Sequence, residues 1–143
     1  MLKIEDFTNA QTRIKDALLE TSLIYSPWSS KECENEIYIK PENLQRTGSF
    51  KIRGAYNKIA KLSDDKKAKG LIASSAGNHA QGVDYAANHI GVKSVICMPA
   101  HTPLIKVEST RGYGAEVVLH GEVYDDAFKR ACELEQQHGY TFI

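Results

Sequence analysis

From about residue 50 onward, the chain alternates short apolar runs with longer segments whose apolar residues recur at helical spacing. The apolar runs, which we expect to be strands, cover residues 71–74, 94–98, 115–119 and 140–143. The segments between them, which we expect to be helices, cover residues 49–62, 78–90, 102–112 and 122–137. Strands that alternate with helices of this length form right-handed βαβ units with parallel strands. The predicted fold class is therefore α/β, an open twisted parallel sheet with helices on both faces.

The ends of these predicted helices carry recognisable capping residues. Ser49 stands where a side chain can cap the start of the first helix. Thr102 and Pro103 have the order of an N-cap followed by proline at the first helical position. Gly91 and Gly139 follow two of the helices, where a left-handed C-terminal cap is expected. Each signal supports the boundaries that the hydrophobic spacing predicts.

The first 45 residues have a less regular pattern. Residues 8–19 are predicted to form an amphipathic helix with Thr8 as its N-cap. Residues 25–35, rich in serine and with one proline, are predicted to form a loop. Residues 37–39 form a short apolar run that Pro41 ends, as expected of a short strand. The regular alternation begins only after this segment.

Composition excludes several classes of function. The chain has 18 basic and 18 acidic residues, so it has no net charge with which to attract nucleic acid. It has no run of about 18 apolar residues, so no membrane span is expected. No two of its histidines have the i, i+4 spacing with which a helix shares a zinc ion, so no metal site is expected. The three cysteines are widely spaced, as is typical of thiols in a reducing compartment, and we expect a cytoplasmic protein.

A lysine stands in the first turn of the predicted helix 49–62. Lys51 lies within the segment Thr47–Ala55, which reads Thr-Gly-Ser-Phe-Lys-Ile-Arg-Gly-Ala. The positive end of a helix dipole disfavours an ammonium group, and reactive lysines that form Schiff bases are found where the charged form is disfavoured. On this evidence alone Lys51 has two interpretations, a reactive amine and an ordinary surface lysine.

A second polar segment, Ser74–Gly82, joins a predicted strand to a predicted helix. Open α/β sheets bind ligands at this position, where free backbone N–H groups at a helix N-terminus attract anions. Gly77 permits close approach of a ligand, and Ser75 and Asn78 add polar side chains. The segment is interpreted either as an anion site or as a capped helix start.

Taken together, these segments resemble the threonine dehydratase family. The similarity includes residues 40–55, 74–82, 98–99, 102–107, 110–118 and 124–127, in the same order and at the same spacing. This family has the tryptophan-synthase-β-like fold, known as fold type II of the enzymes that use pyridoxal phosphate. The resemblance implies that residues 50–143 form the family's small α/β domain. Residues 1–49 would be the N-terminal segment, a helix and a strand, of an incomplete large domain.

The resemblance also implies roles for particular residues. Lys51 would hold pyridoxal phosphate as a Schiff base, Phe50 would flank the cofactor ring, and Asn78 would hydrogen-bond its 3′ oxygen. The carboxylate of an amino acid substrate would be bound by five consecutive residues, Ser75, Ala76, Gly77, Asn78 and His79. The implied reaction is an α,β-elimination that converts threonine to 2-oxobutanoate, or serine to pyruvate, with release of ammonia.

Serine racemase is the main alternative within this family. Its eukaryotic members resemble this sequence and use a serine of the corresponding motif to protonate the opposite face of the substrate carbanion. The aligned residue here is Ala76, which has no proton to donate. The sequence therefore favours elimination over racemisation. Cysteine synthases differ around the cofactor lysine and are a weaker match.

The sequence departs from the family in length. Family members continue with a glycine-rich loop that binds the cofactor phosphate and a serine that contacts the pyridine nitrogen, and neither has a counterpart in these 143 residues. We therefore expect a fragment that is inactive by itself, and the alternative to an enzyme is a folded domain without activity. Apolar residues near the N-terminus also predict a homo-oligomer, because they would lack partners within the chain.

Overall fold

The computed structural model describes all 143 residues, and its centre is a parallel sheet of four strands in the order β5-β4-β3-β6. The strands are β3 (Leu71–Ser74), β4 (Ser94–Met98), β5 (Glu116–Leu119) and β6 (Thr141–Phe142). In the register of the sheet, Ile72 lies between Val95 of β4 and Phe142 of β6. The α/β fold and the parallel sheet that the sequence predicts are confirmed.

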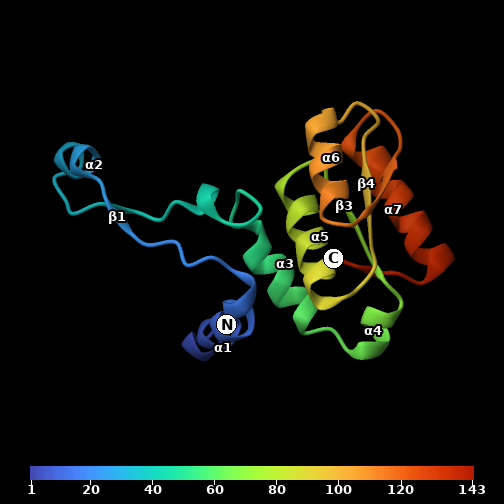
Figure 1. The fold of residues 1–143 in the computed structure, drawn as a ribbon, viewed down its shortest axis with the longest axis horizontal. Coiled ribbons are helices and arrows are strands. Elements are labelled where there is room, and N and C mark those ends of the chain that lie inside the picture. The colour runs from blue at the N-terminus through green and yellow to red at the C-terminus, as the bar shows by residue number, and fades with distance from the viewer.

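Helices cover both faces of the sheet (Figure 1). On one face, α5 (Asn78–Ile90) and α6 (Leu104–Gly112) pack on the strands, and α3 (Lys51–Ala60) lies against α5. On the other face, α7 (Tyr124–His138) packs on the strands through Ala127, Ala131 and Leu134. β3 and β4 are buried from end to end because both of their faces are covered, which explains why their sequences are continuously apolar.

The helix ends agree with the predicted signals at some positions only. Gly91 and Gly139 have φ angles of 78° and 72°, so both form the predicted left-handed caps. Thr102 is not a cap, because its hydroxyl donates to the carbonyl of Pro99 and α6 begins two residues later. Ser49 is not the N-cap of α3 either: the helix begins at Lys51 with Phe50 as its cap residue.

The first helix, α1 (Ile4–Ile14), begins earlier than predicted. Thr8 lies inside it and its hydroxyl donates to the Glu5 carbonyl at 3.1 Å, so the prediction of Thr8 as an N-cap is wrong. The capping group is the Asp6 carboxylate, which accepts from the Lys3 N–H at 2.8 Å. A single 3₁₀ turn, η1 (Lys15–Ala17), follows.

The predicted loop over residues 25–35 is also wrong in part. It contains a short helix, α2 (Pro27–Glu32), whose first turn is capped by the hydroxyl of Ser26. On either side of it, β1 (Ile24–Tyr25) pairs in antiparallel fashion with β2 (Tyr38–Ile39). Two further short elements are the 3₁₀ turn η2 (Glu42–Leu44) and the helix α4 (Asp64–Ala68).

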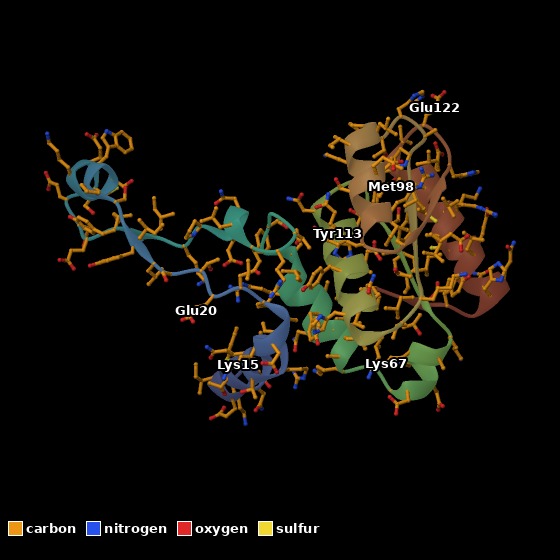
Figure 2. All side chains as sticks on the ribbon, in the orientation of Figure 1. Lys15, Glu20, Lys67, Met98, Tyr113 and Glu122 are labelled. Atoms are coloured by element: carbon orange, nitrogen blue, oxygen red, sulfur yellow. The ribbon has the colours of Figure 1, made fainter.

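We call residues 51–143 the sheet domain and residues 18–46 the arm. The arm follows α1, extends away from the sheet domain and returns to it before α3 (Figure 1). Side chains of the arm project on both sides of a thin ribbon, whereas Met98 lies among the crowded side chains of the sheet (Figure 2). At the base of the arm, α1 contacts α3 through a hydrogen bond from Arg13 to Asn57. None of the helices has both the length and the apolar character needed to cross a membrane.

Candidate functional site

The segment predicted to bind an anion lies at the carboxyl edge of the sheet. β3 ends at Ser74 and α5 begins at Asn78, so residues 75–77 form the turn between them. The Ser75 N–H donates to the Cys97 carbonyl of β4 at 3.1 Å, which extends the strand pairing into the turn. From β3 the chain continues to β4 and β5 on one side of β3, whereas β6, the last strand, pairs with β3 on its other side. The turn therefore lies at a topological switch point, where open α/β sheets bind ligands.

The turn presents polar groups on an accessible surface. The Gly77 N–H donates to Ser75 Oγ at 3.3 Å, and Asn78 is exposed at the first position of α5. His79 Nε2 lies 3.5 Å from the carbonyl oxygen of Ile143, which places the imidazole beside the end of β6. Ser75, Ala76 and Gly77 are partly buried. All five residues predicted to bind the carboxylate are thus grouped at one end of α5.

Close packing of α3 on α5 brings Lys51 to the same end of α5. A Cβ atom added to Gly82 would lie 3.0 Å from the Ile52 backbone nitrogen and 3.1 Å from the Lys51 carbonyl carbon. Since such separations are tighter than most contacts that a Cβ makes, the absence of a side chain at Gly82 lets the first turn of α3 lie close to α5. Gly82 is four residues, about one helical turn, from the start of α5. Lys51 and the turn therefore occupy one region.

The Lys51 side chain is free to react. It is exposed, takes part in no hydrogen bond or ion pair, and its Nζ lies 5.0 Å from the centroid of the Phe50 ring. The Phe50 ring is itself 58% exposed. Gly48, two residues before Phe50, has a φ angle of 67°, a left-handed conformation that favours glycine, and this bend directs the chain from the arm into α3.

Two buried hydroxyls in these segments have no hydrogen-bond partner. They are Thr47 Oγ1, in the loop before α3, and Ser74 Oγ, at the end of β3. Both residues are more than nine-tenths buried, and a buried hydroxyl without a partner is costly. An exposed amine, a neighbouring aromatic ring and polar groups with unused hydrogen-bonding capacity fit a planar, polar cofactor that carries an aldehyde.

One cavity of the chain lies away from these segments. Its volume is about 730 Å³ and ten residues line it, among them Ile14, Lys15, Lys40 and Arg53. Neither Lys51 nor the turn is among its lining residues. The candidate site is therefore separate from this cavity.

Sequence reasoning missed one charged residue at this site. Lys106, in the first turn of α6, has its Nζ 4.0 Å from the position that a Cβ of Gly77 would occupy. Lys106 has the same sequence signal as Lys51, because each is a lysine in the first turn of a predicted helix. What the sequence does not reveal is that α6 packs beside α5 and so places this ammonium over the turn.

Comparison with known proteins agrees with this arrangement. L-threonine ammonia-lyase of Thermotoga maritima is 47% identical over 143 residues, which are all of this chain and 36% of that protein. Serine racemase of Dictyostelium discoideum superposes with a TM-score of 0.91 at 32% identity, over 99% of this chain and 46% of the other. Threonine deaminase isoform 2 of Solanum lycopersicum superposes with a TM-score of 0.87 at 37% identity, over 99% of this chain and 40% of the other.

These relatives have the fold type II structure over their N-terminal part, and the chain spans less than half of the length of each. A family model described as pyridoxal-phosphate dependent enzyme matches residues 14–143, which include the whole arm and the whole sheet domain. The chain belongs to the family of pyridoxal-phosphate dependent enzymes.

Proposed function

We propose that this chain is part of a pyridoxal-phosphate dependent threonine or serine dehydratase, which converts L-threonine to 2-oxobutanoate and ammonia. The observation that carries the proposal is the position of Lys51, an unpaired amine held against the end of α5 where the turn 75–79 presents its polar groups. The 47% identity to L-threonine ammonia-lyase of Thermotoga maritima supports this choice of substrate.

Each residue has a defined part in the proposed site. Lys51 would hold the cofactor covalently through Nζ, and its amine, when free, would take the α-proton. Phe50 would flank the cofactor ring, and the Asn78 amide would donate to the ring's 3′ oxygen. The turn Ser75–His79 binds the substrate carboxylate and so orients the α-carbon towards Lys51. When bound, pyridoxal phosphate supplies the electron sink that stabilises negative charge at the α-carbon.

The experiment is a titration of the chain with pyridoxal phosphate, followed by the visible absorbance of the protonated imine. We expect this band in the wild-type chain and its loss in Lys51→Ala. Lys58→Ala is the matched control, because Lys58 is an exposed lysine near the other end of the same helix. A band that persists in Lys51→Ala would place the cofactor elsewhere and would contradict the proposal.

Racemisation is the second candidate, because serine racemase of Dictyostelium discoideum has so similar a structure. Ala76 argues against it, since a methyl group cannot donate a proton to the far face of the α-carbon. The two reactions differ in their products, because elimination releases ammonia and a 2-oxo acid, whereas racemisation yields the D-amino acid.

A folded domain without activity is the third candidate, and it is supported by the chain's coverage of only 36% of the ammonia-lyase. The resemblance assigns the binding of the cofactor phosphate and ring nitrogen to parts of the family outside these residues. We therefore expect no turnover of threonine by the purified 143-residue chain, assayed by formation of 2-oxobutanoate in the presence of pyridoxal phosphate. Sustained turnover would contradict this expectation.

A further inference from the structure

The first turn of α3, which carries Lys51, has few stabilising groups of its own. Its cap residue is Phe50, whose side chain makes no capping hydrogen bond, and the turn contains no aspartate or glutamate. The Lys51 N–H makes only a long hydrogen bond of 3.4 Å to Ser49 Oγ. Helix starts of this kind fray, because their N–H groups lack partners and no acidic residue offsets the positive end of the dipole. Contacts from outside α3 must therefore hold this turn in place.

One such contact comes from the arm. Arg53, the third residue of α3, donates from Nε and Nη2 to the two carboxylate oxygens of Glu42, at 2.7 and 2.8 Å. The pair is partly shielded from water, since the side chains of Arg53 and Glu42 are 33% and 17% exposed. Two parallel hydrogen bonds fix the orientation of the guanidinium as well as its distance. The arm thus holds the first turn of α3 in a defined direction.

Glu42 is itself held firmly at the base of the arm. Its Oε1 accepts from the Thr21 hydroxyl at 2.6 Å, and Lys40 Nζ donates to the Thr21 carbonyl at 2.6 Å. The Gln45 side chain, in a residue only 3% exposed, bonds both the N–H and the carbonyl of Leu19 at 2.8 Å. These contacts join the outgoing and returning runs of the arm. Glu42 therefore projects from a cross-linked base and not from a loose loop.

The order of residues in α3 connects this pair to Lys51. Successive residues of an α-helix lie about 100° apart around its axis, so Lys51 and Arg53 flank Ile52 on its two sides. Ile52 is fully buried, and its backbone lies close to Gly82 of α5. Figure 1 shows α3 in this position, between the arm and α5. Contacts on two sides of the first turn fix its rotation about the helix axis, and with it the direction in which the Lys51 side chain leaves.

We propose that Glu42 is a positioning residue for Lys51, on which it acts through Arg53. The inference rests on the proposed function, because it concerns the placing of the Lys51 amine for reaction with pyridoxal phosphate. An amine that reacts with a bound carbonyl must be held close to it, and small displacements slow such reactions steeply. The arm thereby contributes to the candidate site through α3.

The first test requires no cofactor. Hydrogen exchange of the full ¹⁵N-labelled chain, followed by NMR, compares the Arg53 N–H, which donates to the Phe50 carbonyl at 3.0 Å, with the N–H groups of β4. Glu42→Gln should speed exchange at Arg53 about tenfold more than in β4, because the first turn opens locally when the charged pair is lost. Equal acceleration at both places would overturn the inference.

Ile59→Val is the matched control for this measurement. Ile59 is fully buried near the other end of α3, so the loss of one methyl group lowers the stability of the same helix without touching the arm. Exchange at Arg53 should then change only as much as exchange in β4. A local effect of Ile59→Val at Arg53 as large as that of Glu42→Gln would show a general loss of stability and would also overturn the inference.

The second test is the affinity for pyridoxal phosphate, measured by the absorbance band of the imine under conditions where every variant is folded. Glu42→Gln and Arg53→Gln should each weaken binding about tenfold, and the double variant no further, because the two side chains act as one pair. Ile59→Val should bind like the wild type. Additive losses in the double variant would show that Glu42 does not act through Arg53 and would reject the assignment.

The two tests separate this inference from the proposed function. A normal band with unchanged affinity in Glu42→Gln would reject the role of Glu42 and leave the role of Lys51 intact. A wild-type chain without the band would contradict the proposed function, and the exchange rates alone would then decide whether Glu42 holds the first turn of α3.

Discussion

At the scale of single residues, Gly82 sets how closely α5 approaches the first turn of α3. We expect Gly82→Ala to lower the free energy of unfolding by about 1–3 kcal/mol, because the new Cβ would press on the backbone of Ile52 and Lys51, which cannot turn aside. Thermal or chemical unfolding followed by circular dichroism measures this change.

Gly54→Ala is the control for this substitution. Gly54 also lies in a helix, α3, but no atom is within 4 Å of the position of its Cβ. Alanine should therefore stabilise the chain by up to about 1 kcal/mol through its higher helix propensity. If the two substitutions had the same effect, the close contact at Gly82 would have no energetic significance.

At the scale of elements, a two-pronged ion pair fastens the base of the arm to α3. Both carboxylate oxygens of Glu42 accept from Arg53, at 2.7 and 2.8 Å, and one also accepts from the Thr21 hydroxyl at 2.6 Å. The hydrogen bonds from Arg53 are the main reason why the pKa of Glu42 is lowered from 4.5 to about 2. The pair therefore stabilises the fold while Glu42 is ionised.

Because the pKa of Glu42 is lowered in the folded chain, the stability that the ion pair contributes depends on pH. A carboxylate with a lowered pKa contributes stability above its ordinary pKa, and the contribution is lost as the pH falls from about 4.5 through about 2. We expect Glu42→Gln to cost about 1–2 kcal/mol at pH 7 and distinctly less at pH 2, as measured by chemical unfolding. Glu116→Gln, which breaks an exposed pair with Lys93, should cost under about 0.5 kcal/mol at pH 7. Equal costs for Glu42→Gln at both pH values would contradict the argument.

The sequence predicted those elements whose burial or whose ends require particular residue types. β3 and β4 were predictable because covering both faces makes the strand continuously apolar, and Gly91 and Gly139 mark helix ends that require a left-handed residue. β1 and α2 were not, because two paired residues or six helical ones are too few to show a period.

The sequence predicted only those parts of the candidate site that lie within short recognisable segments. Lys51 and the turn 75–79 lie in recognisable segments, and the comparisons confirm the family that these segments indicate. Lys106 was missed because its place over Gly77 depends on how α6 packs against α5. Such a contact is set by the tertiary structure and leaves no local signature. The role of each residue in binding stays a prediction.

At the scale of the whole molecule, the arm and the sheet domain differ in how they bury apolar surface. The sheet domain has a core on each face, whereas the arm exposes most of its large apolar side chains. Trp28 is 74% exposed, and Ile24 and Ile39 on the paired strands β1 and β2 are about half exposed. Since an apolar surface of this kind is costly in water, the arm is the part of the chain most in need of a partner.

We therefore expect the 143-residue chain to self-associate through its arm. Trp28 is the only tryptophan, so its fluorescence reports on the arm alone, and its emission should move to shorter wavelength as the protein concentration rises and water leaves the indole. Sedimentation velocity should show a larger species over the same range of concentration. Ile39→Asp should suppress both changes, because a charge on β2 opposes burial of the arm, whereas Leu104→Asp, which adds the same charge to exposed α6, should not. A monomer with constant emission at all concentrations would show that the arm remains in contact with water, and an equal effect of the two substitutions would place the contact outside the arm.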